Sequence, residues 1–166
     1  MANQKELDLC YISVAEAHAK LSKAQRKRVG CALVTQNGVV LAGCNGLAPG
    51  GSNELEYKEY MSAGAGDWLD VEYVLETWPL EDNMGRYKLV TKPETIHAEL
   101  SCILRAAREG VSVVGGTLYT TLSCCKPCSE MVAAAGIKRV VYTEEYRDTS
   151  GIENLKALGV TVEKLV

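Results

Sequence analysis

The sequence predicts an α/β fold in which helices cover both faces of a sheet. In the C-terminal half of the chain, short apolar stretches that suit strands alternate with longer stretches that suit helices. A further helix and a strand–turn–strand unit precede them, so the order is a helix followed by β-β-α-β-α-β-α-β. This alternation is typical of a sheet that lies between helical layers.

The first helix is predicted at residues 4–22. Its apolar stripe recurs at helical spacing and consists of Leu7, Tyr11, Val14, His18 and Leu21. We expect this stripe to pack on the sheet, with His18 as a core histidine bonded to a backbone carbonyl rather than as a metal ligand.

A strand, a tight turn and a second strand are predicted at residues 29–46. The pair Asn37-Gly38 is typical of a two-residue hairpin turn. That turn sets Cys31 opposite Cys44 on neighbouring strands, and we interpret them as two small buried side chains rather than as a disulfide.

The connection at about residues 47–94 is too long for a plain loop, so we expect it to carry structure of its own. One stripe in it has helical spacing and consists of Trp68, Val71, Leu75 and Trp78. We interpret this stripe as a local mini-core; the alternative is a surface for a partner or an effector.

The C-terminal half supplies the remaining elements. Helices are predicted at residues 97–110, 125–136 and 151–159, and strands at 117–123, 137–146 and 160–166. The first two helices end at Gly110 and Gly136, as helices commonly do.

The length, net charge and cysteine content of the chain limit the class of protein. A chain of 166 residues suits a single domain, here residues 1–166 with the insert at about 47–94. The net charge of −3 argues against a nucleic-acid binder, which needs a basic surface. No signal peptide or membrane-spanning run is recognisable, so we expect a cytoplasmic protein. In such a chain, seven cysteines indicate thiols or metal ligands.

A cysteine pair marks the start of the predicted helix at 125–136. Cys125 and Cys128 have C-x-x-C spacing, and Pro127 fits only the first turn of a helix. At a helix N-terminus the dipole lowers the pKa of both thiols, so we expect two thiolates. Taken alone, the pair is also compatible with a thiol oxidoreductase.

His97 and Glu99 open the predicted helix at 97–110, and in a first turn both side chains can converge beyond the helix end. If the two helix starts lie side by side, one imidazole and two thiolates meet. Three protein ligands leave the fourth position of zinc open, which is the mark of a catalytic site. Cys124 is then a bystander; if it were a fourth ligand, the chain would be a non-catalytic, zinc-held interaction module.

These motifs resemble the deoxycytidylate (dCMP) deaminases of the cytidine/deoxycytidylate deaminase superfamily, whose signature is H-x-E followed by P-C-x-x-C. The matching stretches are "HAE", "SCCKPC", "GCNGLAPGG", "VTKPETIHAE" and "TLYTTLSCCKPC". Two departures stand out: Cys124 replaces the usual proline and Cys44 a usual tyrosine. In the family this proline shapes the wall of the substrate pocket, whereas the metal ligands are other residues.

The resemblance implies a three-layer α/β/α sandwich around a five-stranded mixed sheet. It implies zinc on His97, Cys125 and Cys128, and hydrolysis of dCMP to dUMP and ammonia with Glu99 as the proton carrier. Members are usually oligomeric and often hexameric, so we expect a homo-oligomer, and dCTP is kept as a further substrate of this protein. Many are activated by dCTP and inhibited by dTTP, which would bind with Mg²⁺.

The resemblance also implies binding residues. For the substrate they are Ser22, Lys23, Arg26, Asn45, Ala98 and Ser123. We add Tyr119 and Tyr146 as residues that flank the base or sugar; for Tyr119 a core position in a strand is an equal alternative. For a triphosphate effector they are Gly50, Gly51, Asn53 and Lys92. Another superfamily branch, a nucleoside or tRNA base deaminase, is the alternative enzyme, and the acidic pI of about 5.5 argues against tRNA.

Overall fold

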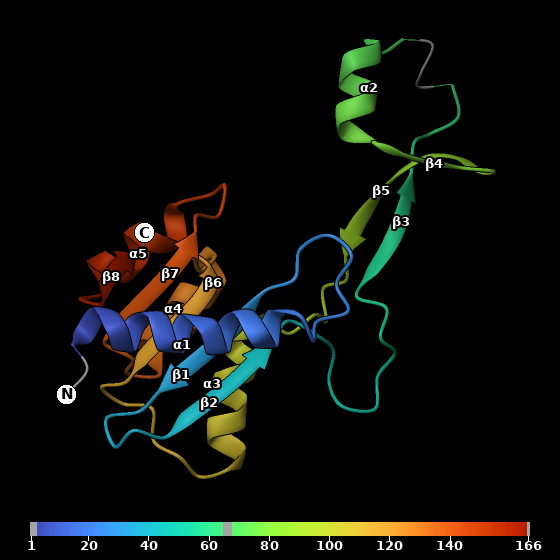
Figure 1. The fold of residues 1–166 in the computed structure, drawn as a ribbon. Coiled ribbons are helices and arrows are strands. Elements are labelled where there is room, and N and C mark those ends of the chain that lie inside the picture. Colours follow the sequence, from blue (N-terminus) through green and yellow to red (C-terminus); the bar gives the residue numbers. More distant parts are fainter. Residues whose placement is uncertain (1–2, 65–67, 166) are drawn as a thin grey trace.

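The computed structural model describes residues 3–64 and 68–165, and within them five strands form one mixed sheet (Figure 1). Their order across the sheet is β2-β1-β6-β7-β8. The strands are β1 (Gly30–Val34), β2 (Val40–Cys44), β6 (Thr117–Leu122), β7 (Arg139–Glu144) and β8 (Thr161–Lys164). β1 runs antiparallel to both β2 and β6, whereas β6, β7 and β8 are parallel. The predicted fold class is confirmed.

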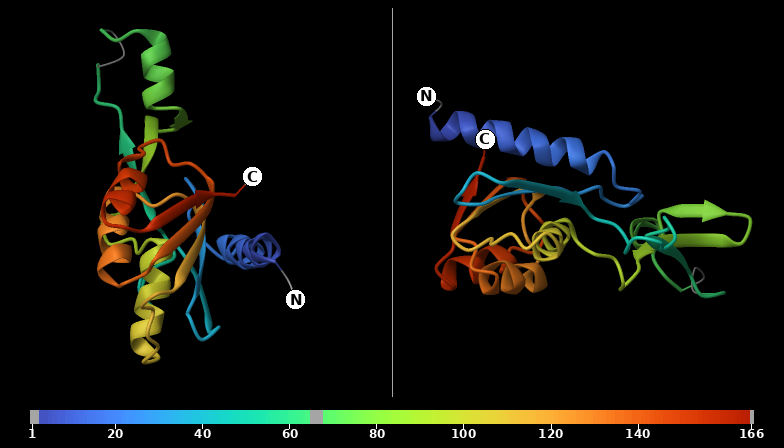
Figure 2. Two further views of the ribbon diagram at one scale, coloured as in Figure 1. Left: turned by 90° about the vertical axis from the view of Figure 1, so that its left-hand side faces the viewer. Right: turned by 90° about the horizontal axis from the view of Figure 1, so that it is seen from below.

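Helices lie on both faces of this sheet, as Figure 2 shows. They are α1 (Gln4–Ala19), α3 (Ala98–Arg108), α4 (Lys126–Ala134) and α5 (Ser150–Ala157). The helix α1 packs on one face, where Ile12 and Ala15 meet Ala32 and Val141. The other three helices cover the opposite face and bury the larger core. Among the described residues, no helix has both the length and the apolar character needed to cross a membrane.

The buried stripe of α1 differs from the predicted one. Asp8, Ile12 and Ala15 are buried, whereas Leu7 and Leu21 are 37% and 61% exposed. The helix also ends at Ala19, before Leu21. The apolar pattern was misleading because the Asp8 carboxylate occupies the buried face, where the half-buried Arg139 compensates its charge.

The register of the first hairpin is also shifted by one residue from the prediction. Cys31 pairs with Gly43, and Cys44 pairs with Gly30. The loop is longer than expected, since the Thr35 amide bonds the Val39 carbonyl, and Gly38 takes φ of +79°. A three-residue loop with glycine in the left-handed conformation is the next most common hairpin connection. Cys31 therefore packs against the α3 side of the sheet without facing Cys44.

The insert has its own structure, as predicted. A second sheet with the order β3-β5-β4 carries one short helix and projects from the main body (Figure 1). Its elements are β3 (Glu56–Tyr60), α2 (Val71–Thr77), β4 (Leu80–Asp82) and β5 (Gly85–Thr91). The predicted mini-core is wrong, because Trp68, Val71 and Leu75 are 89%, 71% and 46% exposed. Residues 65–67 of the insert lie outside the described residues.

Both ends of the insert are tied to each other and to the main body. The Lys92 amide bonds the Leu55 carbonyl at 2.8 Å, and the strand pairing begins at once with Glu56 opposite Thr91. Gly46 and Ile96 exchange backbone hydrogen bonds just outside this pair. The insert therefore leaves the main body after Gly46 and rejoins it beside that point, directly before His97.

A buried ion pair joins α1 to the far strands of the sheet. Both guanidinium Nη atoms of Arg139 donate to the Asp8 carboxylate at 2.7 Å, and the Tyr119 hydroxyl donates to it at 2.9 Å. Arg139 also bonds both carboxylate oxygens of Glu163. The bonds from Arg139 are the main reason why the pKa of Asp8 falls to about 2.

This pKa makes the stability of the fold depend on pH. A carboxylate with a depressed pKa stabilises the folded state above its unfolded pKa of 3.8, and this stabilisation is lost as the pH falls towards 2. We expect Asp8→Asn to lower the free energy of unfolding by about 2 kcal/mol at about pH 7. At about pH 3 the difference from the wild type should shrink to roughly half.

Urea unfolding at the two pH values measures this difference. Glu16→Gln on the exposed side of α1 is the matched control, with no change expected. A loss from Asp8→Asn that is the same at both pH values would contradict the assignment.

Candidate active site and metal centre

Two helices begin side by side at one end of the sheet. His97 is the N-cap of α3 and Cys125 is the N-cap of α4, both with extended backbone angles. Among the described residues, neither side chain caps its own helix, so both are available for other contacts. Pro127 lies in the first turn of α4, as predicted. The free first-turn amides of both helices give this place a positive potential.

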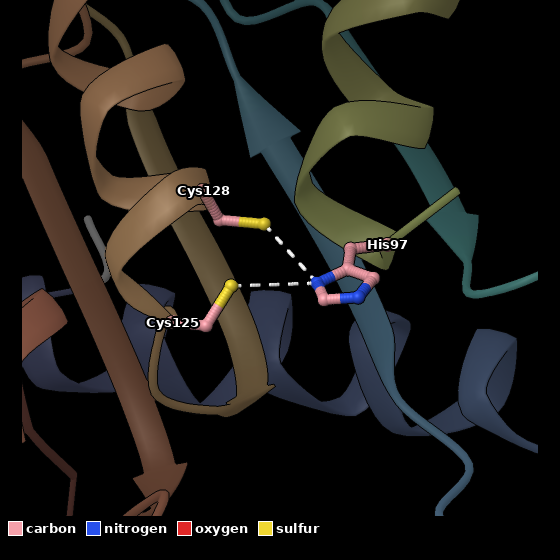
Figure 3. Close-up of side chains that lie close together, drawn as sticks. All are labelled: His97, Cys125 and Cys128. Atoms are coloured by element: carbon pink, nitrogen blue, oxygen red, sulfur yellow. Dashed lines mark hydrogen bonds between the residues drawn. The ribbon is translucent and has the colours of Figure 1, made fainter. Parts of the chain in front are cut away.

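His97, Cys125 and Cys128 converge in this place, as Figure 3 shows. The His97 Nδ1 atom lies 3.5 Å from the Cys125 Sγ atom and 3.3 Å from the Cys128 Sγ atom. A tetrahedral zinc ion with bonds of about 2.3 Å to sulfur and about 2.1 Å to nitrogen separates such donors by about 3.6 Å. The spacing and the donor types therefore fit zinc.

The two thiols differ in proton affinity. The pKa of Cys125 is lowered to about 4, mainly by a hydrogen bond from the Cys128 thiol and also by His97. The Cys125 thiolate and burial raise the pKa of Cys128. Two adjacent thiolates repel each other unless a cation lies between them, so the prediction of two thiolates applies to the metal-bound site.

Glu99 lies in the first turn of α3 and is only 4% exposed. Burial raises the pKa of its carboxyl group above the ordinary value of 4.5. His97 and Glu99 both line one cavity with Cys125, so the predicted convergence of these side chains is found. A carboxyl group with a raised pKa beside a metal centre is suited to carrying a proton.

Cys124 lies outside the triad. Among the described residues, the cluster of possible metal ligands contains His97, Cys125 and Cys128 without Cys124. The Cys124 side chain is 1% exposed and belongs to the main hydrophobic core. Its backbone touches α5 closely, since a Cβ atom at Gly151 would lie 2.0 Å from the Cys124 carbonyl oxygen.

The cavity beside the triad has a volume of about 230 Å³. His97, Glu99 and Cys125 supply its chemical groups, and Arg26 and Lys27 supply positive charge. Its other lining residues are Val29, Asn45, Glu56, Thr91, Thr95, Ala98, Leu122, Ser123 and Tyr146. A cavity of this size suits a small ligand, and Arg26 offers that ligand a positive charge.

Five of the predicted substrate residues line this cavity: Arg26, Asn45, Ala98, Ser123 and Tyr146. Among the described residues, the lining does not include Ser22, Lys23 or Tyr119, so no cavity contact supports the predicted substrate role of these three residues. Tyr119 alternates to the opposite face of β6, where its hydroxyl group bonds Asp8. Lys23 is exposed to solvent.

Ser22 and Asn45 organise the segment that carries Arg26. The Ser22 hydroxyl group donates to the Asn45 carbonyl at 3.0 Å and accepts from the Ala24 amide. The Asn45 side chain accepts from the Val29 amide at 2.9 Å and donates to the Lys27 carbonyl at 3.0 Å. Ser22 thus acts through the backbone, and Asn45 combines a structural role with a place in the cavity wall.

Sequence reasoning missed the contribution of the insert to the cavity. Glu56 and Thr91, which pair across β3 and β5, line it together with Thr95. The Arg26 guanidinium group donates to the Thr91 hydroxyl at 3.2 Å. No local motif marks these residues, because long-range strand pairing brings them to the cavity.

The predicted effector residues lie at the base of the insert. Gly50 takes φ of +89° in an exposed turn that also contains Gly51 and Asn53, and Lys92 follows β5. Beside this turn lies a second cavity of about 270 Å³, whose lining includes Pro49, Arg105 and Arg108. The two arginines on α3 were not predicted, and the four predicted residues are not part of this lining among the described residues.

Comparisons with known proteins agree with the site. A model of the cytidine and deoxycytidylate deaminase zinc-binding region matches residues 5–144. The deoxycytidylate deaminase of Enterobacteria phage T4 is 30% identical over 155 residues, with 81% of this chain and 76% of the phage protein covered. That of Mycobacterium phage D29 is 30% identical over 143 residues, with 86% and 98% covered.

A solved structure is similar over nearly its whole length. The dCMP deaminase of cyanophage S-TIM5, crystallised with dCMP and dUMP, superposes with a TM-score of 0.74 at 32% sequence identity. The match covers 98% of this chain and 99% of the cyanophage chain. Because the family model spans the triad, the buried carboxylate and most of the sheet, the chain belongs to the cytidine and deoxycytidylate deaminases, a family of zinc-binding enzymes.

Proposed function

We propose that this protein hydrolyses dCMP to dUMP and ammonia. The observation that carries the proposal is the His97–Cys125–Cys128 triad beside buried Glu99, in a cavity that also contains Arg26. The relatives of phages T4 and D29 are named deoxycytidylate deaminases, and the cyanophage enzyme was crystallised with dCMP and dUMP. Arg26 in the cavity lining supports a nucleotide rather than a neutral nucleoside as substrate.

His97, Cys125 and Cys128 would hold the zinc ion, and the donor types and spacings described above support this assignment. Zinc, when bound, lowers the pKa of a water ligand and so supplies hydroxide near neutral pH. Three protein ligands leave a position open for that chemistry. In this proposal Cys124 contributes to the core and not to the metal site.

Glu99 would move the protons of the reaction. Its carboxylate takes a proton from the attacking water and delivers it to N3 of the pyrimidine, which makes C4 electrophilic. The carboxylate, now ionised again, then takes the proton of the new C4 hydroxyl group and transfers it to the departing amine, which leaves as ammonia while C4 becomes the carbonyl of dUMP. We assign the Ala98 amide in the first turn of α3 to the pyrimidine O2, and the Ser123 carbonyl to the leaving amine. Both residues line the cavity.

Arg26 would bind the 5′-phosphate. Its planar guanidinium group can grip two phosphate oxygens, and its bond to Thr91 keeps the side chain at the cavity. Lys27 adds a second positive charge, and Tyr146 is assigned to the sugar or base. We extend the proposal to dCTP as a further substrate, because its first phosphate occupies the same position as that of dCMP.

We further propose regulation by dCTP as activator and dTTP as inhibitor, bound with Mg²⁺ near Gly50, Gly51, Asn53 and Lys92. The second cavity supports a triphosphate site in this region, since Arg105 and Arg108 line it. Exposed apolar residues on and beside α2 support self-association, which we place at a hexamer. Rate and sedimentation measurements with each nucleotide test both points, and an unchanged rate contradicts regulation.

The zinc assignment predicts a contrast between two adjacent cysteines. Replacement of His97, Cys125 or Cys128 by alanine should each reduce zinc from about one ion per chain to near zero, because two remaining donors hold it poorly. Cys124→Ala is the matched control and should retain zinc and most activity. Zinc is measured on the purified protein by atomic absorption; loss of zinc in Cys124→Ala would favour a closed structural site.

Glu99→Gln tests proton transfer. The amide has nearly the same size as the carboxylate but cannot carry the proton. The variant should fold and retain zinc, yet its kcat for dCMP should fall by about 10²- to 10⁴-fold. Ammonia release and zinc content are measured on the same sample. Turnover near that of the wild type would exclude the proposed role of Glu99.

Arg26→Ala tests phosphate recognition and the substrate class. Each hydrogen bond to a charged group contributes about 1.5–3 kcal/mol, so kcat/KM for dCMP should fall by about 10- to 100-fold or more. The slow reaction of deoxycytidine, which lacks the phosphate, should remain nearly unchanged. Lys23→Ala, an exposed lysine outside the cavity lining, is the matched control.

Ammonia release from dCMP, dCTP, deoxycytidine, cytidine and adenosine completes the test. An equal loss on dCMP and deoxycytidine in Arg26→Ala would assign Arg26 to the fold. Equal wild-type rates on these two substrates would replace the nucleotide proposal by a nucleoside deaminase.

A further inference from the structure

The insert holds Arg26 at two points. The Oε1 atom of Glu56 accepts hydrogen bonds from the Gln25 amide at 3.1 Å and from the Arg26 amide at 3.2 Å. The Thr91 hydroxyl group accepts a hydrogen bond from Nη1 of the Arg26 guanidinium group at 3.2 Å. Glu56 begins β3 and pairs with Thr91, the last residue of β5. One pair of residues in the insert sheet thus fixes both the backbone and the side chain of Arg26.

The guanidinium group of Arg26 remains able to bind an anion. Among the described residues it forms no ion pair, whereas the neighbouring Lys27 is paired with Glu144. The hydrogen bond to Thr91 uses one of its five N–H donors and leaves four for a ligand. Arg26 therefore brings to the cavity a positive charge that no carboxylate of the described residues compensates.

The orientation of this group affects how well it binds phosphate. A free arginine side chain samples many rotamers and loses this freedom when it grips a ligand, which weakens binding. A hydrogen bond that forms before the ligand arrives reduces this loss, because the side chain is already ordered. The planar guanidinium group must also present its donors to two oxygens in one plane. The bond to Thr91 restricts both the position and the rotation of that plane.

We propose that Thr91 is a positioning residue, whose hydroxyl group holds the Arg26 guanidinium group in the orientation that receives the 5′-phosphate of the substrate. Glu56 fixes the backbone of Arg26 from the same pair of strands. The insert thus sets the affinity of the enzyme for a nucleotide by acting through Arg26. This inference rests on the proposed function, in which Arg26 binds the 5′-phosphate.

Thr91→Val tests this role, because it removes the acceptor and keeps a branched side chain that suits a strand. The KM for dCMP should rise by about 3- to 10-fold, since the substrate must then order Arg26 itself. The kcat at saturating dCMP should change by less than about twofold, and so should kcat/KM for deoxycytidine, which has no phosphate. Thr91→Ser restores the hydroxyl group and should return the KM to within about twofold of the wild-type value.

A double-mutant cycle separates positioning from direct contact with the substrate. If Thr91 acts through Arg26, adding Thr91→Val to Arg26→Ala should change kcat/KM for dCMP by less than about twofold. Thr77→Val is the matched control, because Thr77 is a half-buried threonine at the end of α2, outside the cavity lining that the described residues form. It should leave the KM for dCMP unchanged. If Thr91→Val fails to fold, Thr91→Ala replaces it with the same expectations.

Three outcomes would overturn the inference. They are an unchanged KM for dCMP in Thr91→Val, a further loss of about threefold or more when this change is added to Arg26→Ala, and an equal loss on dCMP and deoxycytidine. The second would show that Thr91 contacts the substrate directly, and the third that it supports the fold. Failure of the proposed function is a separate result, because wild-type enzyme would then not prefer dCMP to deoxycytidine.

Discussion

The site depends on the juxtaposition of two helix N-termini. His97 and Cys125 each occupy an N-cap, and the starts of α3 and α4 meet because their preceding segments approach the same end of the sheet. Unpaired amides at both starts favour anions, so thiolates and a carboxylate can gather in a largely buried place. Removing either helix start would separate the donors, and no other part of the site would compensate.

Two parts of the chain, the main body and the insert, form the cavity next to this centre. The main sheet and α3 supply Glu99, Ala98 and Ser123, which are buried. The insert supplies another part of the wall, where Glu56 and Thr91 hold the backbone and the side chain of Arg26. Different parts of the chain therefore supply the residues for the reaction and those for substrate recognition. Hydrogen bonds at Arg26 join the insert to the segment that carries this residue.

The sequence allowed the metal triad to be predicted, because C-x-x-C spacing, Pro127 and H-x-E are local patterns tied to helix starts. The register of the first hairpin and the buried face of α1 could not be predicted in this way. The first was set by a loop one residue longer than Asn37-Gly38 suggests. The second was set by an ion pair between Asp8 and Arg139, which are far apart in the sequence.

The contribution of the insert to the cavity could not be predicted from the sequence for a related reason. Glu56 and Thr91 carry no motif, and their meeting depends on pairing between strands separated by a helix and a third strand. Lys23 and Arg26, in contrast, lie in one basic stretch at residues 20–28, and the sequence does not distinguish their roles. Only the fold separates Arg26, which reaches the cavity, from Lys23, which points to solvent.

The closeness of the two ends of the insert has a consequence for the evolution of such enzymes. A backbone hydrogen bond joins Leu55 to Lys92 at the base of the insert. The main body therefore contacts the same two residues whatever segment lies between them. Loop-closure entropy grows only slowly with length, so a longer or shorter insert costs the core little stability. Exchange of this module would alter the part of the cavity wall that Glu56 and Thr91 form while leaving the chemical centre in place, and substrate choice can thus change without a new fold.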